Sequence, residues 1–137
     1  MKIFICCSKH FYDKVDSIKK ELEKEEHEIT LPNSFDKPFM EEEVRNLGKE
    51  QHAKWKGEML RLQEEKIRNN DAILVLNFEK NGQANYIGGA TFLEMFKAWE
   101  LKKELYLFNP IPDNILKDEI LGFSPIIING DLSKLKK

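Results

Sequence analysis

The sequence has little cysteine and no long apolar run, and these absences exclude several classes of protein. Its only two cysteines, Cys6 and Cys7, are adjacent, so they cannot frame a disulfide scaffold. They also lack a nearby pair of histidines, which makes a zinc site a poor interpretation. No apolar stretch approaches the roughly 18 residues that a membrane-spanning helix needs. We therefore expect no metal site and no membrane partner, and no pattern indicates an organic cofactor.

The chain also lacks an excess of charge of either sign. It carries 22 Lys and Arg against 24 Asp and Glu, for a formal net charge of −2. A nucleic-acid-binding domain is usually strongly basic, so we expect no nucleic-acid partner. Residues 1–11 lack the long apolar region and cleavage site of a signal peptide, which predicts a cytoplasmic protein. The length of 137 residues predicts a single domain over 1–137.

Short apolar runs alternate with segments whose apolar residues recur every three to four positions. Five runs predict β-strands at 2–8, 27–32, 71–78, 104–110 and 125–129. Four segments between them predict helices at 11–26, 40–69, 90–103 and 113–121. Region 40–69 is predicted as one or two helices, with Gly48 or Gly57 as the break. Trp55 and Trp99 lie at helical spacing and are predicted to pack in the core.

This alternation predicts an α/β fold, a three-layer sandwich around a five-stranded parallel sheet. The expected strand order is the flavodoxin-like 2-1-3-4-5. In that order ligands bind beyond the carboxyl ends of strands 1 and 3, where the direction of winding reverses. The loops that follow these two strands are therefore the predicted site.

The loop after the first strand carries a cluster of polar side chains at the start of a helix. These are Cys7, Ser8, Lys9, His10 and Tyr12. In one interpretation, the free N–H groups of the helix, with Lys9 and His10, bind a phosphate, and Tyr12 reaches a sugar. In the other, Ser8 only caps the helix and Lys9 is solvated. A nucleophilic Cys7 would need a base and a lowered pKa, and only His10 is near in sequence.

The loop after the third strand begins at Asn77 and contains the pair Gly88–Gly89. A phospho-acceptor domain would need an aspartate at position 77, so that class is excluded. No strand is followed by the G-x-G-x-x-G pattern of dinucleotide-binding folds. Paired glycines permit positive φ angles and close approach of the backbone to a ligand. We therefore predict that Asn77 and both glycines contact a substrate.

Glu94 follows the glycine pair and has two interpretations. Thr91 and Glu94 match the T-x-x-E capping box, in which both side chains only secure the helix start. Alternatively, Glu94 faces a pocket as a reactive carboxylate. The first turn of a helix stabilises negative charge, so the carboxylate is expected to be ionised there. An ionised carboxylate suits nucleophilic attack or stabilisation of a cation.

Residues 70–112 carry a family resemblance in an aspartate-opened apolar strand, a glycine-containing loop, a glutamate in the next helix and a lysine-led strand. This stretch resembles the core of the nucleoside 2-deoxyribosyltransferase-like superfamily, which includes the deoxynucleoside 5′-monophosphate N-glycosidases. The variant of the pattern is similar to an uncharacterised branch. The resemblance implies a domain that binds a nucleoside or nucleotide and often forms dimers or larger homo-oligomers.

The resemblance also implies roles for individual residues. Glu94 is the expected catalytic carboxylate for cleavage or transfer at an N-glycosidic bond, and Tyr12 helps to place it. Gly88 and Gly89 occupy the loop that approaches sugar or phosphate. Gln63 stands where the enzymes usually carry an aspartate that contacts the sugar or base. The alternative is a non-catalytic nucleotide-binding or sensing module on the same fold.

Overall fold

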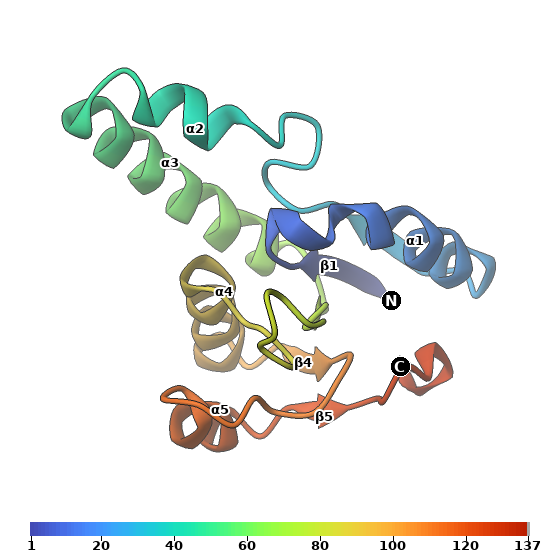
Figure 1. Cartoon of the computed structure of the whole chain (residues 1–137). Helices are drawn as coiled ribbons and strands as arrows, with labels where there is room; N and C mark the ends of the chain where they lie inside the picture. Colours follow the sequence, from blue (N-terminus) through green and yellow to red (C-terminus); the bar gives the residue numbers. More distant parts are fainter. Residues whose placement is uncertain (137) are drawn as a thin grey trace.

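The protein is built around a five-stranded, all-parallel sheet in the order β2-β1-β3-β4-β5 (Figure 1). The computed structural model describes residues 1–136, and Lys137 lies outside the described part. The strands are β1 Lys2–Cys6, β2 Glu28–Thr30, β3 Ala72–Val75, β4 Glu104–Leu107 and β5 Ile126–Ile127. The predicted fold class, parallel sheet and strand order are confirmed.

The two central strands are buried on both faces, because helices cover both sides of the sheet. All four residues of β3 are buried, and β1 is buried from its second residue onward. Their register pairs Ile3 with Ala72 and Cys6 with Val75. The carboxyl ends of β1 and β3 therefore lie side by side, which brings the loops that follow them to the same edge.

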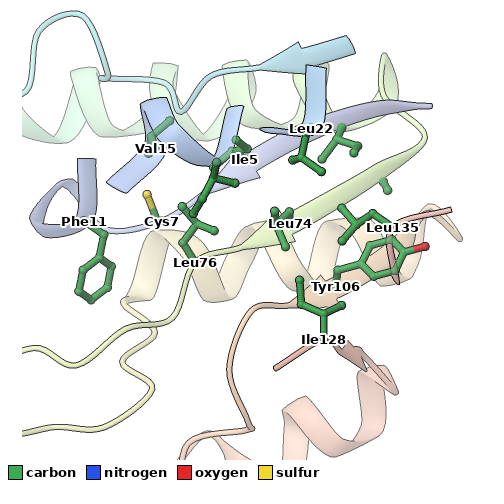
Figure 2. Packing of buried hydrophobic residues seen from close by; sticks show 13 residues of the cluster. Ile5, Cys7, Phe11, Val15, Leu22, Leu74, Leu76, Tyr106, Ile128 and Leu135 are labelled. Atoms are coloured by element: carbon green, nitrogen blue, oxygen red, sulfur yellow. The ribbon is translucent and has the colours of Figure 1, made fainter. Parts of the chain in front are cut away.

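The helices form two layers. The α-helices of the described residues are α1 Val15–Lys24, α2 Met40–Arg45, α3 Lys49–Arg68, α4 Gly89–Glu100 and α5 Lys117–Phe123, with short 3₁₀ helices η1 Lys9–Lys14 and η2 Leu132–Lys134. Side chains of η1 and α1 pack on one face of the sheet, with Leu74 and Tyr106 (Figure 2). Side chains of α3, α4 and α5 pack on the other face. Within residues 1–136, no helix combines the length and apolarity needed to cross a bilayer.

Region 40–69 forms two helices that meet at Gly48, one of the two predicted breaks. Gly48 has φ +116°, a conformation that side-chain-bearing residues rarely adopt. Gly57 lies inside α3 and does not interrupt it. α2 buries none of its residues, and α3 extends past the edge of the sheet (Figure 1). This projecting helix pair supplies one wall of the site described next.

Candidate functional site

A cavity of about 280 Å³ opens at the carboxyl edge of β1. It is bounded by the loops after β1 and β2, by α2 and α3, and by the start of α4. Its lining residues are Cys7, Ser8, Lys9, Tyr12, Pro32, Asn33, Ser34, Pro38, Glu41, Trp55, Lys56, Met59, Gln63, Lys80, Gly88, Gly89, Ala90, Thr91 and Glu94. Eight of the ten side chains and glycines predicted from the sequence are in this set.

The capping-box interpretation of Glu94 is wrong. α4 begins at Gly89 with Gly88 as its N-cap, three residues earlier than a Thr91 cap requires, and no side chain bonds to the cap position. Thr91 is a buried helical residue, and Glu94 is the sixth residue of the helix. Glu94 therefore lies in the second turn of α4, where it does not cap the helix, and it lines the cavity.

The expectation that the helix start keeps Glu94 ionised is also wrong. Its side chain is only 7% exposed, and burial raises its pKa to about 8. A hydrogen bond from the Cys6 thiol and the positive charge of Lys66 oppose this rise without cancelling it. Lys66 is held nearby by donating to the Leu31 carbonyl oxygen at 3.0 Å. At neutral pH the free protein therefore carries Glu94 mainly as the neutral acid.

Tyr12 lies on the cavity wall contributed by η1. Its ring packs against Phe35 with the centroids 5.5 Å apart, and the backbone of Ser34 forms a hydrogen bond with its hydroxyl. Burial, followed by the proximity of Cys7 and Glu94, raises the pKa of Tyr12 well above its ordinary value. The hydroxyl stays protonated, so it is available as a hydrogen-bond donor that shares the cavity with Glu94.

Ser8 and Lys9 both line the cavity, and each also has a structural role. The Ser8 hydroxyl caps η1 by accepting from the backbone N–H of His10 at 3.3 Å, and Ser8 also lines the cavity. Lys9 lines the cavity too, where its ammonium forms an ion pair with Glu42 of α2. This ion pair connects the loop after β1 with the projecting helix pair.

Cys7 lines the cavity but is a poor nucleophile. Burial raises the pKa of its thiol well above the ordinary value, and the nearby carboxylates of Glu94 and Asp13 raise it further. Reactive cysteines need the opposite shift, because the thiolate is the nucleophile. His10, the base considered from the sequence, is exposed and is not among the lining residues. The structure places its ring against Phe11 instead, at 5.7 Å between centroids.

Gly88 and Gly89 line the cavity as predicted, although neither adopts the positive φ that the sequence allowed. Gly88 has φ −82°. A Cβ there would come within 3.3 Å of the Tyr86 hydroxyl, whereas a Cβ on Gly89 would meet no atom within 4 Å. A side chain at position 88 would therefore be tight against the Tyr86 hydroxyl, whereas one at position 89 would enter open space.

Asn77 does not line the cavity. Its side chain is fully buried and donates to the carbonyl oxygens of Asn109 and Pro110, both at 3.0 Å. It also accepts from the backbone N–H of Asn109 at 2.8 Å. These bonds join the segments that follow β3 and β4. Asn77 therefore holds two loops together. The prediction that it contacts a substrate is wrong, because its side chain is not part of the cavity wall.

Three of the lining residues on α3, Trp55, Met59 and Gln63, form a stripe at intervals of four residues, and Lys56 lies beside it. Gln63 is 5% exposed and donates to the Ala90 carbonyl oxygen at 3.3 Å, next to the start of α4. Trp55 is partly exposed rather than packed in the core, and Trp99 is 50% exposed. The prediction that both tryptophans are core residues is wrong.

Sequence reasoning missed Asn33 and Glu41. Asn33 follows β2, whose carboxyl end lies at the same edge of the sheet as that of β1, and this parallel geometry was the signal available. Glu41 accepts from Lys56 at 3.0 Å and lies 2.9 Å from the Nε2 atom of His52. The glutamates at 41–43 look like a solvated helix start in the sequence, which hid the pairing of Glu41 with α3.

The chain matches no family model, no curated protein and no solved structure. Within the described residues, no group of three or more His, Cys, Asp or Glu side chains is arranged to hold a metal ion. The cavity combines a buried acid, a neutral phenol, three lysines and a partly exposed indole.

Proposed function

We propose that the protein cleaves or transfers at the N-glycosidic bond of a nucleoside or nucleotide, with Glu94 as the reactive carboxylate. The observation that carries this proposal is the position of Glu94, buried at an open cavity that Tyr12 also lines. The Lys9, Lys56 and Lys80 side chains in the same lining are suited to an anionic substituent such as a phosphate.

The chemistry follows from the charge that develops at the sugar. In its carboxylate form, Glu94 attacks C1′ as the bond from C1′ to the base nitrogen breaks, and the electron pair leaves with the base, which takes up a proton. Water then adds at C1′ and releases the Glu94 carboxylate, whereas a second base in place of water gives transfer. The transition state resembles an oxocarbenium ion, which a fixed carboxylate in a dry site stabilises. Tyr12 acts as a neutral hydrogen-bond donor that positions the carboxylate or the sugar.

The alternative is a nucleotide-binding or sensing module without catalysis, and Gln63 favours it. In the resembled enzymes an aspartate occupies this place, while here the side-chain amide donates to the Ala90 carbonyl oxygen. An amide bonded in this way cannot act as a base. The two functions share the same cavity and differ in whether the glycosidic bond breaks.

The deciding experiment incubates the protein with deoxynucleosides, their 5′-monophosphates and NAD, and follows free base by chromatography. We expect base release by the wild type and a loss of at least about a hundredfold in Glu94→Gln, because the amide cannot attack or stabilise a cation. Glu100→Gln, on the exposed face of the same helix, is the matched control and should retain activity. Binding without base release in either protein would favour the sensing module, and absence of both would reject this function.

We also propose a cytoplasmic location and a homo-oligomer. Both cysteines are free thiols, which suits a reducing compartment. The surface for a second copy is the apolar area on α3 and α4, formed by Leu60, Leu93, Phe96 and Trp99, which are 37–50% exposed. Exposed apolar areas of this kind commonly mark protein interfaces.

A further inference from the structure

The cavity has two chemically different ends. Glu94 of α4 lies at its inner end with Gln63, which bonds to Ala90 of the same helix, while Trp55 lies two helical turns along α3 toward the projecting end. Eight residues separate Trp55 from Gln63, so the stripe spans about 12 Å at the helical rise of 1.5 Å per residue. This length leaves room for a second ring beside a sugar placed at Glu94.

Trp55 offers an aromatic surface at that second position, and its neighbours hold it in place. The His52 ring stacks on the indole with the ring planes 17° apart and centroids separated by 6.4 Å. The Lys56 ammonium lies 5.7 Å from the centre of the indole ring. His52 and Lys56 both bond to Glu41, which fixes the arrangement. A planar base can stack on an indole that is held in this way.

Asn33 lines the same cavity as Trp55, and its side-chain oxygen makes no hydrogen bond. Its Nδ2 donates to the Met59 carbonyl oxygen at 3.0 Å, one turn of α3 from Trp55. Its Oδ1 is buried and has no hydrogen-bond partner. An unpaired buried acceptor is unfavourable, and a donor supplied by a ligand would remove that penalty. The unpaired atom is an oxygen, so the ligand group that would satisfy it is a hydrogen-bond donor.

We propose that Asn33 and Trp55 form a base-selecting subsite for a nucleobase that carries an exocyclic amino group. The base stacks on Trp55, and its amino N–H donates to Asn33 Oδ1 after a small adjustment of the Asn33 side chain. A base without that amino group leaves Oδ1 unpaired and binds less tightly. This inference rests on the proposed function, because it takes the sugar to lie at Glu94.

The test compares pairs of probes that differ only in the amino group. One pair is 2′-deoxyadenosine 5′-monophosphate and purine 2′-deoxyriboside 5′-monophosphate. The second is 2′-deoxycytidine 5′-monophosphate and its 4-desamino analogue. Dissociation constants are measured by calorimetry for the wild type, Asn33→Leu, Asn33→Asp and Trp55→Leu. The ratio within each pair is the readout, so a general loss of folding or affinity does not imitate the effect.

We expect the wild type to prefer at least one amino-bearing probe by on the order of tenfold over its partner. Asn33→Leu should abolish this preference, whereas Asn33→Asp, which retains an acceptor, should keep it. Trp55→Leu should weaken both members of the pair equally. Binding without an amino preference, or a preference that survives in Asn33→Leu, overturns the subsite while leaving the N-glycosidase proposal standing. If no probe binds, both proposals fall.

Discussion

At the scale of single residues, the burial of Glu94 places a carboxyl group at the cavity but lowers the stability of the fold. The Glu94 carboxyl group is 7% exposed and has a pKa of about 8, because the charged form loses its hydration when it is buried. The Cys6 thiol and Lys66 provide only part of the compensation that an ion pair would give. Groups kept in unfavourable surroundings are common at functional sites, where they reduce stability in exchange for reactivity.

This burial predicts how Glu94 affects stability. Between pH 4.5, its ordinary pKa, and about pH 8, the folded protein holds a proton that the unfolded chain releases. The free energy of unfolding therefore falls as the pH rises through this window. Glu94→Gln removes the effect, so the variant should exceed wild-type stability above pH 8, by roughly 5 kcal/mol at most. Urea unfolding at pH 5 and pH 9 measures this, and equal differences at both pH values would contradict it.

The same pKa predicts the pH dependence of base release. If the Glu94 carboxylate attacks C1′ or stabilises its positive charge, only the deprotonated enzyme is active. The kcat/KM should then rise with pH and level off above about pH 8, the pKa of the free enzyme. Lys66→Met removes a positive charge near Glu94 and should move the midpoint to higher pH. A rate that falls through this range would instead identify Glu94 as a general acid.

At the scale of secondary-structure elements, periodicity was informative where burial is simple. The run at 71–78 is apolar on both faces, as a central strand must be, and its core became β3. The start of α4 was not predictable from its pattern, because Thr91 and Glu94 match a capping box while the backbone begins the helix at Gly89. The cavity beside Glu94 depends on tertiary packing, which local sequence does not describe.

The junction of α2 and α3 supports a prediction about two glycines. Gly48 has φ +116°, so Gly48→Ala should strain the junction and destabilise the protein by about 1–3 kcal/mol. Gly57 lies within α3 and a Cβ there meets no atom within 4 Å, so Gly57→Ala should stabilise by up to about 1 kcal/mol. Thermal unfolding of the two variants measures both effects. Equal responses would mean that the Gly48 conformation is not required.

At the scale of the whole molecule, the site assembles from segments that are distant in the sequence. The loops after β1 and β2 meet α3 and the start of α4 around one cavity. Strand order identified the edge of the sheet and the loops there, which is why Ser8 could be predicted, and the family resemblance then singled out Tyr12 and Glu94. Strand order carried no information on how far α3 projects, so the roles of Asn33 and Trp55 emerged only from the structure.

The apolar area on α3 and α4 leads to a prediction about assembly. A second cavity of about 360 Å³ lies there, lined by Leu60, Leu93, Phe96, the charged Arg61, Glu64 and Lys97, and by Gly57 and Gln63. Gln63 lines both cavities, so an interface at this surface would adjoin the site. If two copies paired here, the apolar side chains would be removed from water. Arg61, Glu64 and Lys97 would supply both signs of charge for contacts between the copies.

We therefore expect sedimentation equilibrium to give a concentration-dependent dimer for the wild type. Phe96→Lys and Trp99→Lys should each shift the protein toward monomer, because either places a charge in an apolar interface. Ile115→Lys is the matched control, since Ile115 is 92% exposed and lies outside this surface. If the wild type is monomeric, or if all three variants associate like it, the α3–α4 surface is not the interface. If dissociation also weakens nucleotide binding, the link between assembly and site runs through Gln63, whose bond to Ala90 reaches the start of α4.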